Sequence, residues 1–307
     1  MKLSNEAFNR AQAFIFRKAR PLERSLNRFH FTGDSGDVVH QDLIKYHNLD
    51  GGFGNGLEPD LRLPASSAIA TTVAMQVLRR VRASEEDALV KGAMRFLLSI
   101  YDAEQQVWPI IPPNDNSDPH APWWFYDDDL AEHWRGFKSN PRAEILGYLY
   151  EYPGLSSADL RQELTEAVIT HLEAPPEPLE VHDLLCYVRL VETKNLPEDI
   201  KIRLVDLLFP MIDEKVARTP EQWAGYCMRP LDVALSPNSP FLDVLADSLP
   251  RNLDYLIQSQ GNDGAWSPTW SWGPNYPDVW PQAEREWKGV LTQRSLRELK
   301  LFDRLGN

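Results

Sequence analysis

The chain has 307 residues, of which 43% are hydrophobic, so it can bury one large core or two medium ones. Its formal net charge of -13 would repel a phosphate backbone, which excludes nucleic acid as an expected partner. No apolar run reaches the roughly 20 residues that a membrane helix needs, and Arg10 interrupts the apolar residues of the N-terminus, so we expect a cytoplasmic protein without an integral membrane segment.

Apolar residues recur at helical spacing along most of the chain. Ile69, Val73, Val77 and Val81 repeat every four residues, and an apolar stripe at 89–100 follows them. No segment alternates convincingly with period two, so β architectures have little support. The sequence therefore predicts an all-α fold with short helices, interrupted by two long loops at about 102–139 and 260–286. The further helices are expected at about 141–153, 156–172, 180–194, 198–215, 240–258 and 288–302.

One segment of the chain recurs. Residues 47–53 read HNLDGGF and residues 260–266 read QGNDGAW, and each stretch follows the apolar end of a helix. A degenerate third copy is expected between Phe96 and Trp108. In such a turn a glycine permits positive φ, the acidic residue binds nearby backbone groups, and the aromatic residue fills the gap to the next helix.

These motifs resemble those of known families. The pattern Q-x-x-D-G-x-W at 260–266 resembles the QW repeat of squalene-hopene and oxidosqualene cyclases, and D-G-G-F-G at 50–54 resembles a turn of protein prenyltransferase β subunits. The longer stretch 48–62 resembles bacterial proteins described as containing prenyltransferase or squalene-oxidase repeats. The resemblance implies one (α/α)6-barrel-like α/α toroid domain over residues 1–307. It also implies an isoprenoid or other small apolar ligand in an aromatic and acidic central cavity.

Acidic and aromatic residues adjoin each other in the first long loop. A carboxyl held against apolar rings resists ionisation and aromatic faces stabilise a carbocation, so the acidic residues are predicted as catalytic groups. The DxDD motif of class II terpene cyclases is not reproduced, and the DDxxE-like spacing at 128–132 resembles magnesium–diphosphate motifs of a different helical fold. The alternative is a solvated loop or helix N-terminus. The acidic residues are Asp127, Asp128, Asp129 and Glu132.

Two further groups are candidates for ligand binding. Glu58, Asp60 and Arg62 follow the glycine-rich turn and are predicted to form a charged rim, the alternative being a local salt bridge. Aromatic residues of both loops predict a wall for an apolar or sugar ligand, or else packing within the loops. Trp266 and Trp287 are instead expected to pack the repeats. The aromatic candidates are Trp123, Trp124, Trp270, Trp272, Tyr276 and Trp280.

No metal site and no cofactor are predicted. The zinc ligands of protein prenyltransferases include an Asp and a Cys separated by one residue, whereas Leu184 and Gly225 stand at the Asp position before Cys186 and Cys227. The seven histidines form no HxxxH or HExxH pair. We expect both cysteines to be packing residues in the core.

Three functions are compatible with these features. The first is a terpenoid-cyclase-like protein that binds or converts an isoprenoid, and the QW-like repeats favour it. The second is a carbohydrate-active α/α barrel, in which Asp127–Asp129 with Glu58 or Asp60 supply two acids and tryptophans stack on sugars. The third is a binding or scaffold toroid without catalysis. The sequence leaves open whether the protein is an enzyme and what its oligomeric state is.

Overall fold

Helices are the main elements of the fold. The computed structural model describes residues 1–306, in which fifteen α-helices occur and no β-strand does. These elements confirm the all-α prediction. That prediction was based on helical periodicity without a competing period-two pattern. Over the same residues, no helix combines the length and the apolar composition needed to cross a bilayer.

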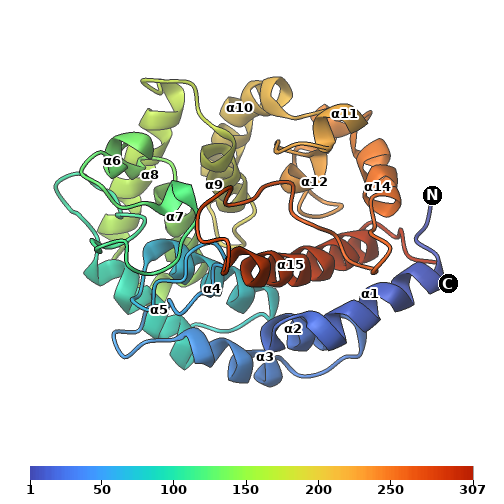
Figure 1. Ribbon diagram of the computed structural model, residues 1–307. Coiled ribbons are helices and arrows are strands. Elements are labelled where there is room, and N and C mark those ends of the chain that lie inside the picture. The colour runs from blue at the N-terminus through green and yellow to red at the C-terminus, as the bar shows by residue number, and fades with distance from the viewer. Residues whose placement is uncertain (307) are drawn as a thin grey trace. The chain divides into compact units, whose positions relative to one another are not determined.

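The chain forms two units (Figure 1). Unit 1 combines Met1–Asp42 with the chain from Ile212 onward, and unit 2 is the continuous stretch Leu43–Met211. In sequence, unit 2 is thus inserted between the two parts of unit 1. Two helices cross the borders between the units, namely α3 (Gly36–Leu43) and α10 (Glu198–Lys215).

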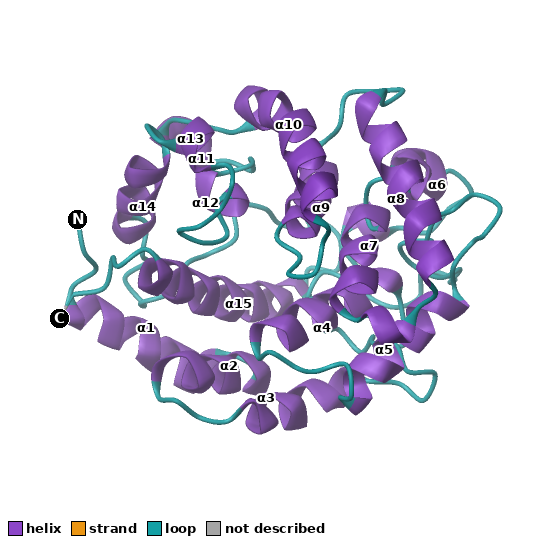
Figure 2. Cartoon of the chain, turned by 180° about the vertical axis from the view of Figure 1, so that it is seen from behind, coloured by secondary structure: helices purple, strands orange, loops and turns teal. Residues whose placement is uncertain are grey.

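Helix α7 is the central helix of unit 2. It contacts α4, α8 and α9, and these helices surround it in Figure 2. All of its residues from Arg142 to Leu149 are buried, including Glu144. This burial on every side explains why α7 lacks a clear polar face. The helices of unit 2 are α4 (Ala68–Arg80), α5 (Ala88–Ser99), α6 (Leu130–His133), α7 (Arg142–Glu151), α8 (Ala158–Glu173) and α9 (Val181–Val191), with most of α10.

Helix α15 packs against the first two helices of unit 1, and Figure 1 shows it in red beside the blue α1 and α2. The two ends of the described chain also meet, because Leu3 N donates to Arg304 O at 2.8 Å and Leu3 is buried. Unit 1 is therefore closed by segments from opposite ends of the sequence. Its helices are α1 (Asn5–Lys18), α2 (Pro21–Phe31), α11 (Pro220–Trp223), α12 (Pro230–Val233), α13 (Leu242–Leu245), α14 (Leu249–Gln258) and α15 (Trp280–Leu301), with most of α3 and the end of α10.

Two predicted segments differ from the structure. The stretch 240–258 holds two separate helices, α13 and α14. Helix α15 begins at Trp280 instead of 288 and has 22 residues, so the second loop is shorter than predicted and this helix is long. The prolines of 260–286 had indicated a loop, but Pro281 lies in the first turn of α15, where its fixed φ suits a helix and its missing N–H needs no acceptor.

The repeated turn has the predicted structure in unit 2. Asp50 Oδ1 accepts a hydrogen bond from Gly52 N at 2.9 Å, and Gly51 has a φ of 94°. Phe53 is fully buried, and its N–H donates to Thr71 Oγ1 of α4 at 3.1 Å. The turn therefore fixes its aromatic residue against the next helix.

The second copy, in unit 1, repeats these contacts. Asp263 Oδ1 accepts from Ala265 N at 3.1 Å, and Gly264 has a φ of 87°. The N–H of Trp266 donates to Thr292 Oγ1 of α15 at 3.1 Å. The repeat in the sequence thus encodes a repeat in the structure.

Indole N–H groups link two copies of the repeat to the preceding helix. Trp266 Nε1 donates to Leu256 O near the end of α14 at 2.7 Å. Trp108 Nε1 donates to Leu97 O near the end of α5, also at 2.7 Å. Carbonyls in the last turn of a helix lack partners within the helix, so each tryptophan caps one of them. The degenerate third copy therefore shares this contact.

Candidate functional site

The aromatic residues of the second loop form two groups in unit 1. In the first group, Trp272 contacts Tyr276 and Trp280 with ring centroids 6.3 Å and 5.7 Å apart. Trp272 is fully buried, whereas Tyr276 and Trp280 are half-buried. The structure thus places Trp272 in the core behind the two rings that reach the surface.

The second group joins three segments of unit 1. Trp270 stands edge-to-face on Tyr226 at 5.8 Å and on Trp287 at 5.0 Å. Tyr226 is 59% exposed, and the other two rings are half-buried. Edge-to-face rings leave part of a π-face uncovered, which suits contact with an apolar or unsaturated ligand. Trp287 thus contacts an aromatic residue of the second loop.

Both groups lie on one face of α15. Trp280, Trp287 and Arg294 follow each other at intervals of seven residues, which is close to two helical turns, and Leu291 lies between the last two. At 1.5 Å per residue, successive members are about 10 Å apart. We name Trp280, Trp287, Leu291 and Arg294, with Trp270 and Tyr226 against them, the α15 wall. All four α15 residues are half-buried.

A group of charges ends the α15 wall. Arg294 Nε donates to Glu298 Oε1 at 2.6 Å, and its Nη2 pairs with Asp232 of α12. The Glu298 carboxylate and then Asp232 raise the pKa of Arg294 against the opposing effect of burial. Arg297, one turn further on, has its pKa lowered by burial. Arg294 thus has two carboxylate partners, whereas the buried Nε of Arg297 has none among residues 1–306, and the end of the wall is polar.

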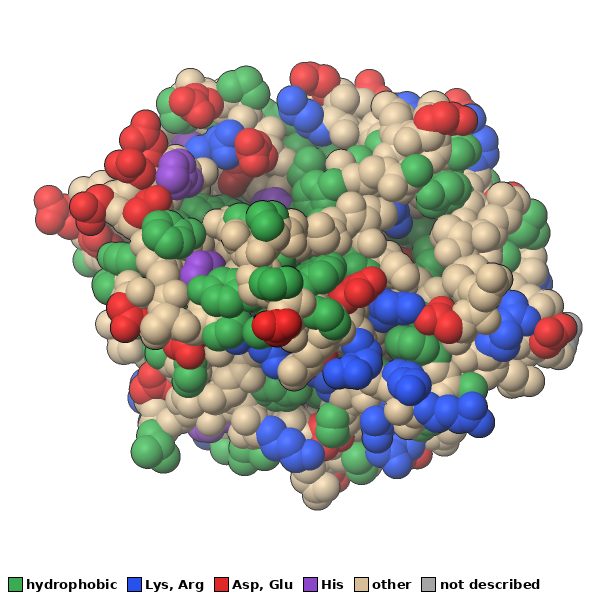
Figure 3. All heavy atoms as spheres, in the orientation of Figure 1, with side chains coloured by type: hydrophobic (Ala, Val, Ile, Leu, Met, Phe, Trp, Pro, Cys, Tyr) green, Lys and Arg blue, Asp and Glu red, His purple; other side chains and the backbone are tan. Residues whose placement is uncertain are grey.

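The predicted acidic cluster lies on the surface of unit 2. Asp128, Asp129 and Glu132 are exposed and Asp127 is half-buried. Figure 3 shows acidic side chains, in red, at the left edge of the view, where α6 lies in Figure 1. Asp127 Oδ1 accepts from Asp129 N at 3.1 Å and lies 3.9 Å from His133 Nδ1. The carboxylates therefore surround the start of the four-residue α6. Across residues 1–306, no three His, Cys, Asp or Glu side chains are placed to hold a metal ion.

The predicted charged rim is brought against the first long loop. Glu58 and Asp60 are buried, and Arg62 is half-buried. The backbone of this segment pairs with the loop, since Arg62 N donates to Pro119 O at 3.0 Å and Ala121 N donates to Asp60 O at 2.8 Å. Two buried carboxyls are thereby held next to the segment that carries the loop's aromatic residues.

Those loop aromatic residues have different environments. Trp124 is buried and stacks on Trp134 at 5.0 Å, with ring planes 7° apart, so it packs the loop. Trp123 is 39% exposed and Phe125 is 51% exposed. Of the two tryptophans of this loop that were predicted to bind ligand, Trp123 is therefore the one available to a ligand at the surface.

A buried polar network in unit 2 was not predicted from the sequence. Glu144 of α7 accepts from Tyr148 Oη at 2.5 Å, from Gln76 Nε2 at 2.8 Å and from Arg189 Nη1 at 2.9 Å. Burial raises the pKa values of Tyr148 and Cys186 well above their ordinary ranges, and Glu144 adds to both shifts. Cys186 is thus the inert packing residue that was expected. The i, i+4 spacing of Glu144 and Tyr148 was the available signal, but their partners are distant in sequence.

Cys227, in unit 1, is half-buried instead of buried, so the expectation of a core position applies to only one of the two cysteines.

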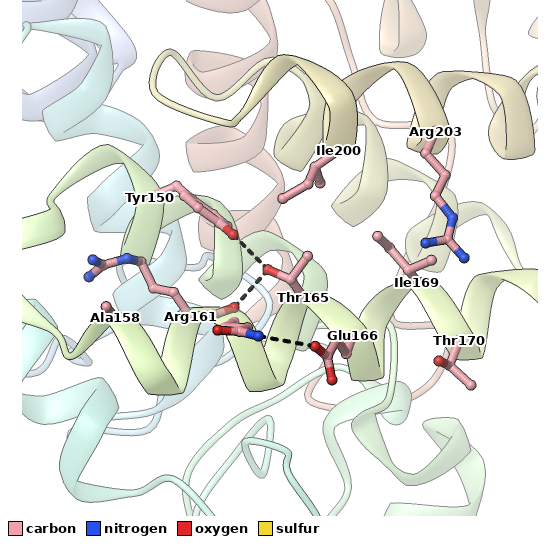
Figure 4. A pocket seen from close by; sticks show the side chains of 10 residues that line it. Tyr150, Ala158, Arg161, Thr165, Glu166, Ile169, Thr170, Ile200 and Arg203 are labelled. Carbon is pink, nitrogen blue, oxygen red and sulfur yellow. Dashed lines mark hydrogen bonds between the residues drawn. The ribbon is translucent and has the colours of Figure 1, made fainter.

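Two open grooves lie on unit 2, and neither is lined by a predicted site residue. One, of about 520 Å³, runs between α8 and the start of α10 (Figure 4). Its polar groups pair with each other: Tyr150 Oη and Thr165 Oγ1 are 2.8 Å apart, and Thr165 Oγ1 also lies 2.7 Å from Arg161 O. The other, of about 580 Å³, contains the 3.4 Å ion pair of Arg79 and Glu151. Neither groove matches the α15 wall in aromatic character.

Comparison of the chain with protein-family models and with curated proteins found no match.

Proposed function

We propose that the protein binds a neutral isoprenoid, or an apolar ligand of similar shape, on the α15 wall. The observation that carries this proposal is the continuous face of Trp280, Trp287 and Leu291, backed by Trp270 and ending in a polar group. The face extends for about 20 Å from Trp280 to Arg294. We further propose that the paired helices form an α/α toroid, which the matching turns at 47–53 and 260–266 support.

The charges at the end of the α15 wall favour a neutral ligand. The positive charges of Arg294 and Arg297 are matched in number by the carboxylates of Asp232 and Glu298, both of which pair with Arg294, so this group has no surplus positive charge for a diphosphate. A ligand hydroxyl that reaches this end has a candidate donor in the buried Nε of Arg297, which has no partner among residues 1–306. We therefore expect geranylgeraniol or squalene to bind more tightly than geranylgeranyl diphosphate.

Equilibrium dialysis with labelled geranylgeraniol and squalene tests this proposal. Loss of the ring in Trp287→Ala should weaken binding by about tenfold or more, because burying an aromatic side chain is worth roughly 1.5–3 kcal/mol. Trp123→Ala is the matched control, since it removes a half-exposed tryptophan of unit 2 and should leave the affinity unchanged. Absence of binding to the wild-type protein, or equal weakening in both variants, would contradict the proposal.

Binding without cyclisation is the simpler form of this function. Acid-initiated cyclisation needs a carboxyl group shielded from water, because water captures carbocations. The predicted acids Asp128 and Asp129 are exposed, so they lack that shielding. We expect geranylgeraniol and squalene to be recovered unchanged after incubation. A product detected by mass spectrometry and abolished by Asp128→Asn would instead assign catalysis to this cluster.

A carbohydrate ligand is the second candidate, and it is favoured by a different site. Trp123 and Phe125 expose their rings beside the segment that holds the buried carboxyls of Glu58 and Asp60. Exposed rings stack on sugars, and a pair of carboxyls is the requirement for glycoside hydrolysis. A glycan array screened with wild-type protein and with Trp123→Ala tests this candidate. Glycan binding that survives in the variant, or none at all, would remove it.

A further inference from the structure

An arginine is buried in unit 2 without an acidic partner. Arg142, the first residue of α7, is 3% exposed and forms no ion pair within residues 1–306. Its Nη2 donates a long hydrogen bond of 3.4 Å to Ala167 O of α8, and its Nε, although buried, donates to no described atom. A buried charge without a partner is strongly unfavourable, so the arrangement calls for a negative group.

Two neighbouring side chains also carry buried polar atoms that lack a partner among residues 1–306. His171 lies one turn after Ala167 on α8, and its Nε2 has no partner. The Tyr101 hydroxyl has none either. The charge of Arg142 acts on both groups: it helps burial to lower the pKa of His171 to about 4, and it opposes the effect of burial on Tyr101. The three groups therefore share one electrostatic environment.

The remaining charges around this position do not neutralise Arg142. Lys138 is a second cation that lowers the pKa of His171. Asp102 and Glu163 act on Tyr101, but both are exposed at the surface and neither pairs with Arg142. Tyr187 reaches the same region, and its hydroxyl lies 3.3 Å from Val168 O. The negative charges close to this position thus act on Tyr101 from the surface, and no carboxylate of residues 1–306 is among the groups that act on Arg142.

All three unpartnered atoms can act as donors. Arginine Nε–H is a donor in every state, a tyrosine hydroxyl can donate, and Nε2 of a neutral histidine donates in one of its two tautomers. The site also adjoins the N-terminal end of α7, where the helix dipole favours negative charge and disfavours the positive charge of Arg142. An anion that accepts several hydrogen bonds would therefore satisfy these three groups.

We propose that Arg142, Tyr101 and His171 bind a small inorganic anion of the halide class, such as chloride. This site is independent of the α15 wall, and its ligand contributes to the stability of unit 2. Neither surface groove of unit 2 is lined by any of the three residues, which fits a compact ion better than a bulky organic anion.

Thermal unfolding at constant ionic strength, with chloride replacing gluconate, tests the site. For a unit of this size, Tm should rise by about 3–5 °C for each tenfold increase in chloride above its dissociation constant. Bromide should act in the same way. Arg142→Gln should abolish the dependence, whereas Arg161→Gln, which removes an arginine of α8 that binds Pro153 O and Ser156 O, should retain it. An equal Tm in chloride and gluconate, or a dependence unchanged in Arg142→Gln, would overturn the proposal.

Two measurements on protein with Arg142 intact keep the proposal testable if that variant fails to fold. A crystal soaked in bromide should show an anomalous peak beside Arg142 Nε. By NMR, chloride should raise the pKa of His171, because a nearby anion favours the protonated ring. A water at this position, or bromide bound only elsewhere, would refute the site, as would a His171 pKa that is the same in both salts.

Discussion

Replacing Gly264 by alanine tests the structure of the repeated turn. Gly264 has a φ of 87°, and an alanine there incurs a strain of roughly 1–2 kcal/mol. Its Cβ would also lie 2.5 Å from the carbonyl carbon and oxygen of Arg10 in α1, which is far inside normal contact. Shifting α1 to relieve this contact should add about 1–3 kcal/mol, as in other overpacked cores. Gly264→Ala is therefore expected to lose about 2–5 kcal/mol of unfolding free energy.

Gly273→Ala is the control for backbone strain alone. Gly273 also has positive φ, at 61°, but a Cβ at this position would have no described atom within 4 Å. Its expected loss is roughly 1–2 kcal/mol. The difference between the two variants isolates the contact between the turn and α1.

Urea unfolding followed by circular dichroism measures both losses, provided that the slope of free energy against urea is unchanged. A midpoint shift that is larger for Gly264→Ala supports close packing of the turn on α1. If the two variants lose the same free energy, glycine is needed at 264 only for its backbone conformation, and our account of the turn is wrong.

Three further predictions concern single side chains. Trp266→Phe removes the indole donor to Leu256 O and should lower the unfolding free energy by about 1–2 kcal/mol in urea titrations. Glu144→Gln leaves the buried end of Arg189 without its carboxylate and should lower the unfolding free energy by about 2–4 kcal/mol. An unchanged urea midpoint would show that the network does not stabilise the fold. The third prediction is a pH dependence in chloride-free buffer, where the unfolding free energy should fall as the pH decreases from about 6.5 to about 4 and should then level off. Between these two pH values the unfolded state binds a proton at His171, whereas the folded state does not. Because His171 is partly exposed, we expect the unfolding free energy to change by about 1–2 kcal/mol over this range. The variant His171→Gln should lack this change.

Local rules account for the parts of the fold that the sequence predicted. The turn at 260–266 was predictable because Asp263, Gly264 and Trp266 act within a few residues of each other. Helix α10 was predicted at its observed bounds because its apolar spacing is regular. The start of α15 was predicted wrongly, because Pro281 was interpreted as part of a loop although it lies in the first turn of this helix.

Features that depend on distant partners could not be predicted. The carboxylate of Glu144 meets Arg189 of α9, which follows 45 residues later, and no local pattern connects them. Adjacent acidic and aromatic residues were visible in the first loop, but composition did not show that water reaches Asp128 and Asp129. The role of Trp287 in the α15 wall emerged only with the bounds of α15, which place it on the same face as Trp280.

The pairing of α1 with α15 has a consequence for biosynthesis. Unit 2 is continuous in sequence, so all of its residues leave the ribosome before α15 is made. Unit 1 needs α15 against α1 and α2, and it can close only after the chain has been translated as far as Leu301. Until then, the apolar faces of α1 and α2 lack their native cover, and exposed apolar surface of this kind is prone to aggregation. The order of translation thus favours folding of unit 2 first, with unit 1 closing afterwards.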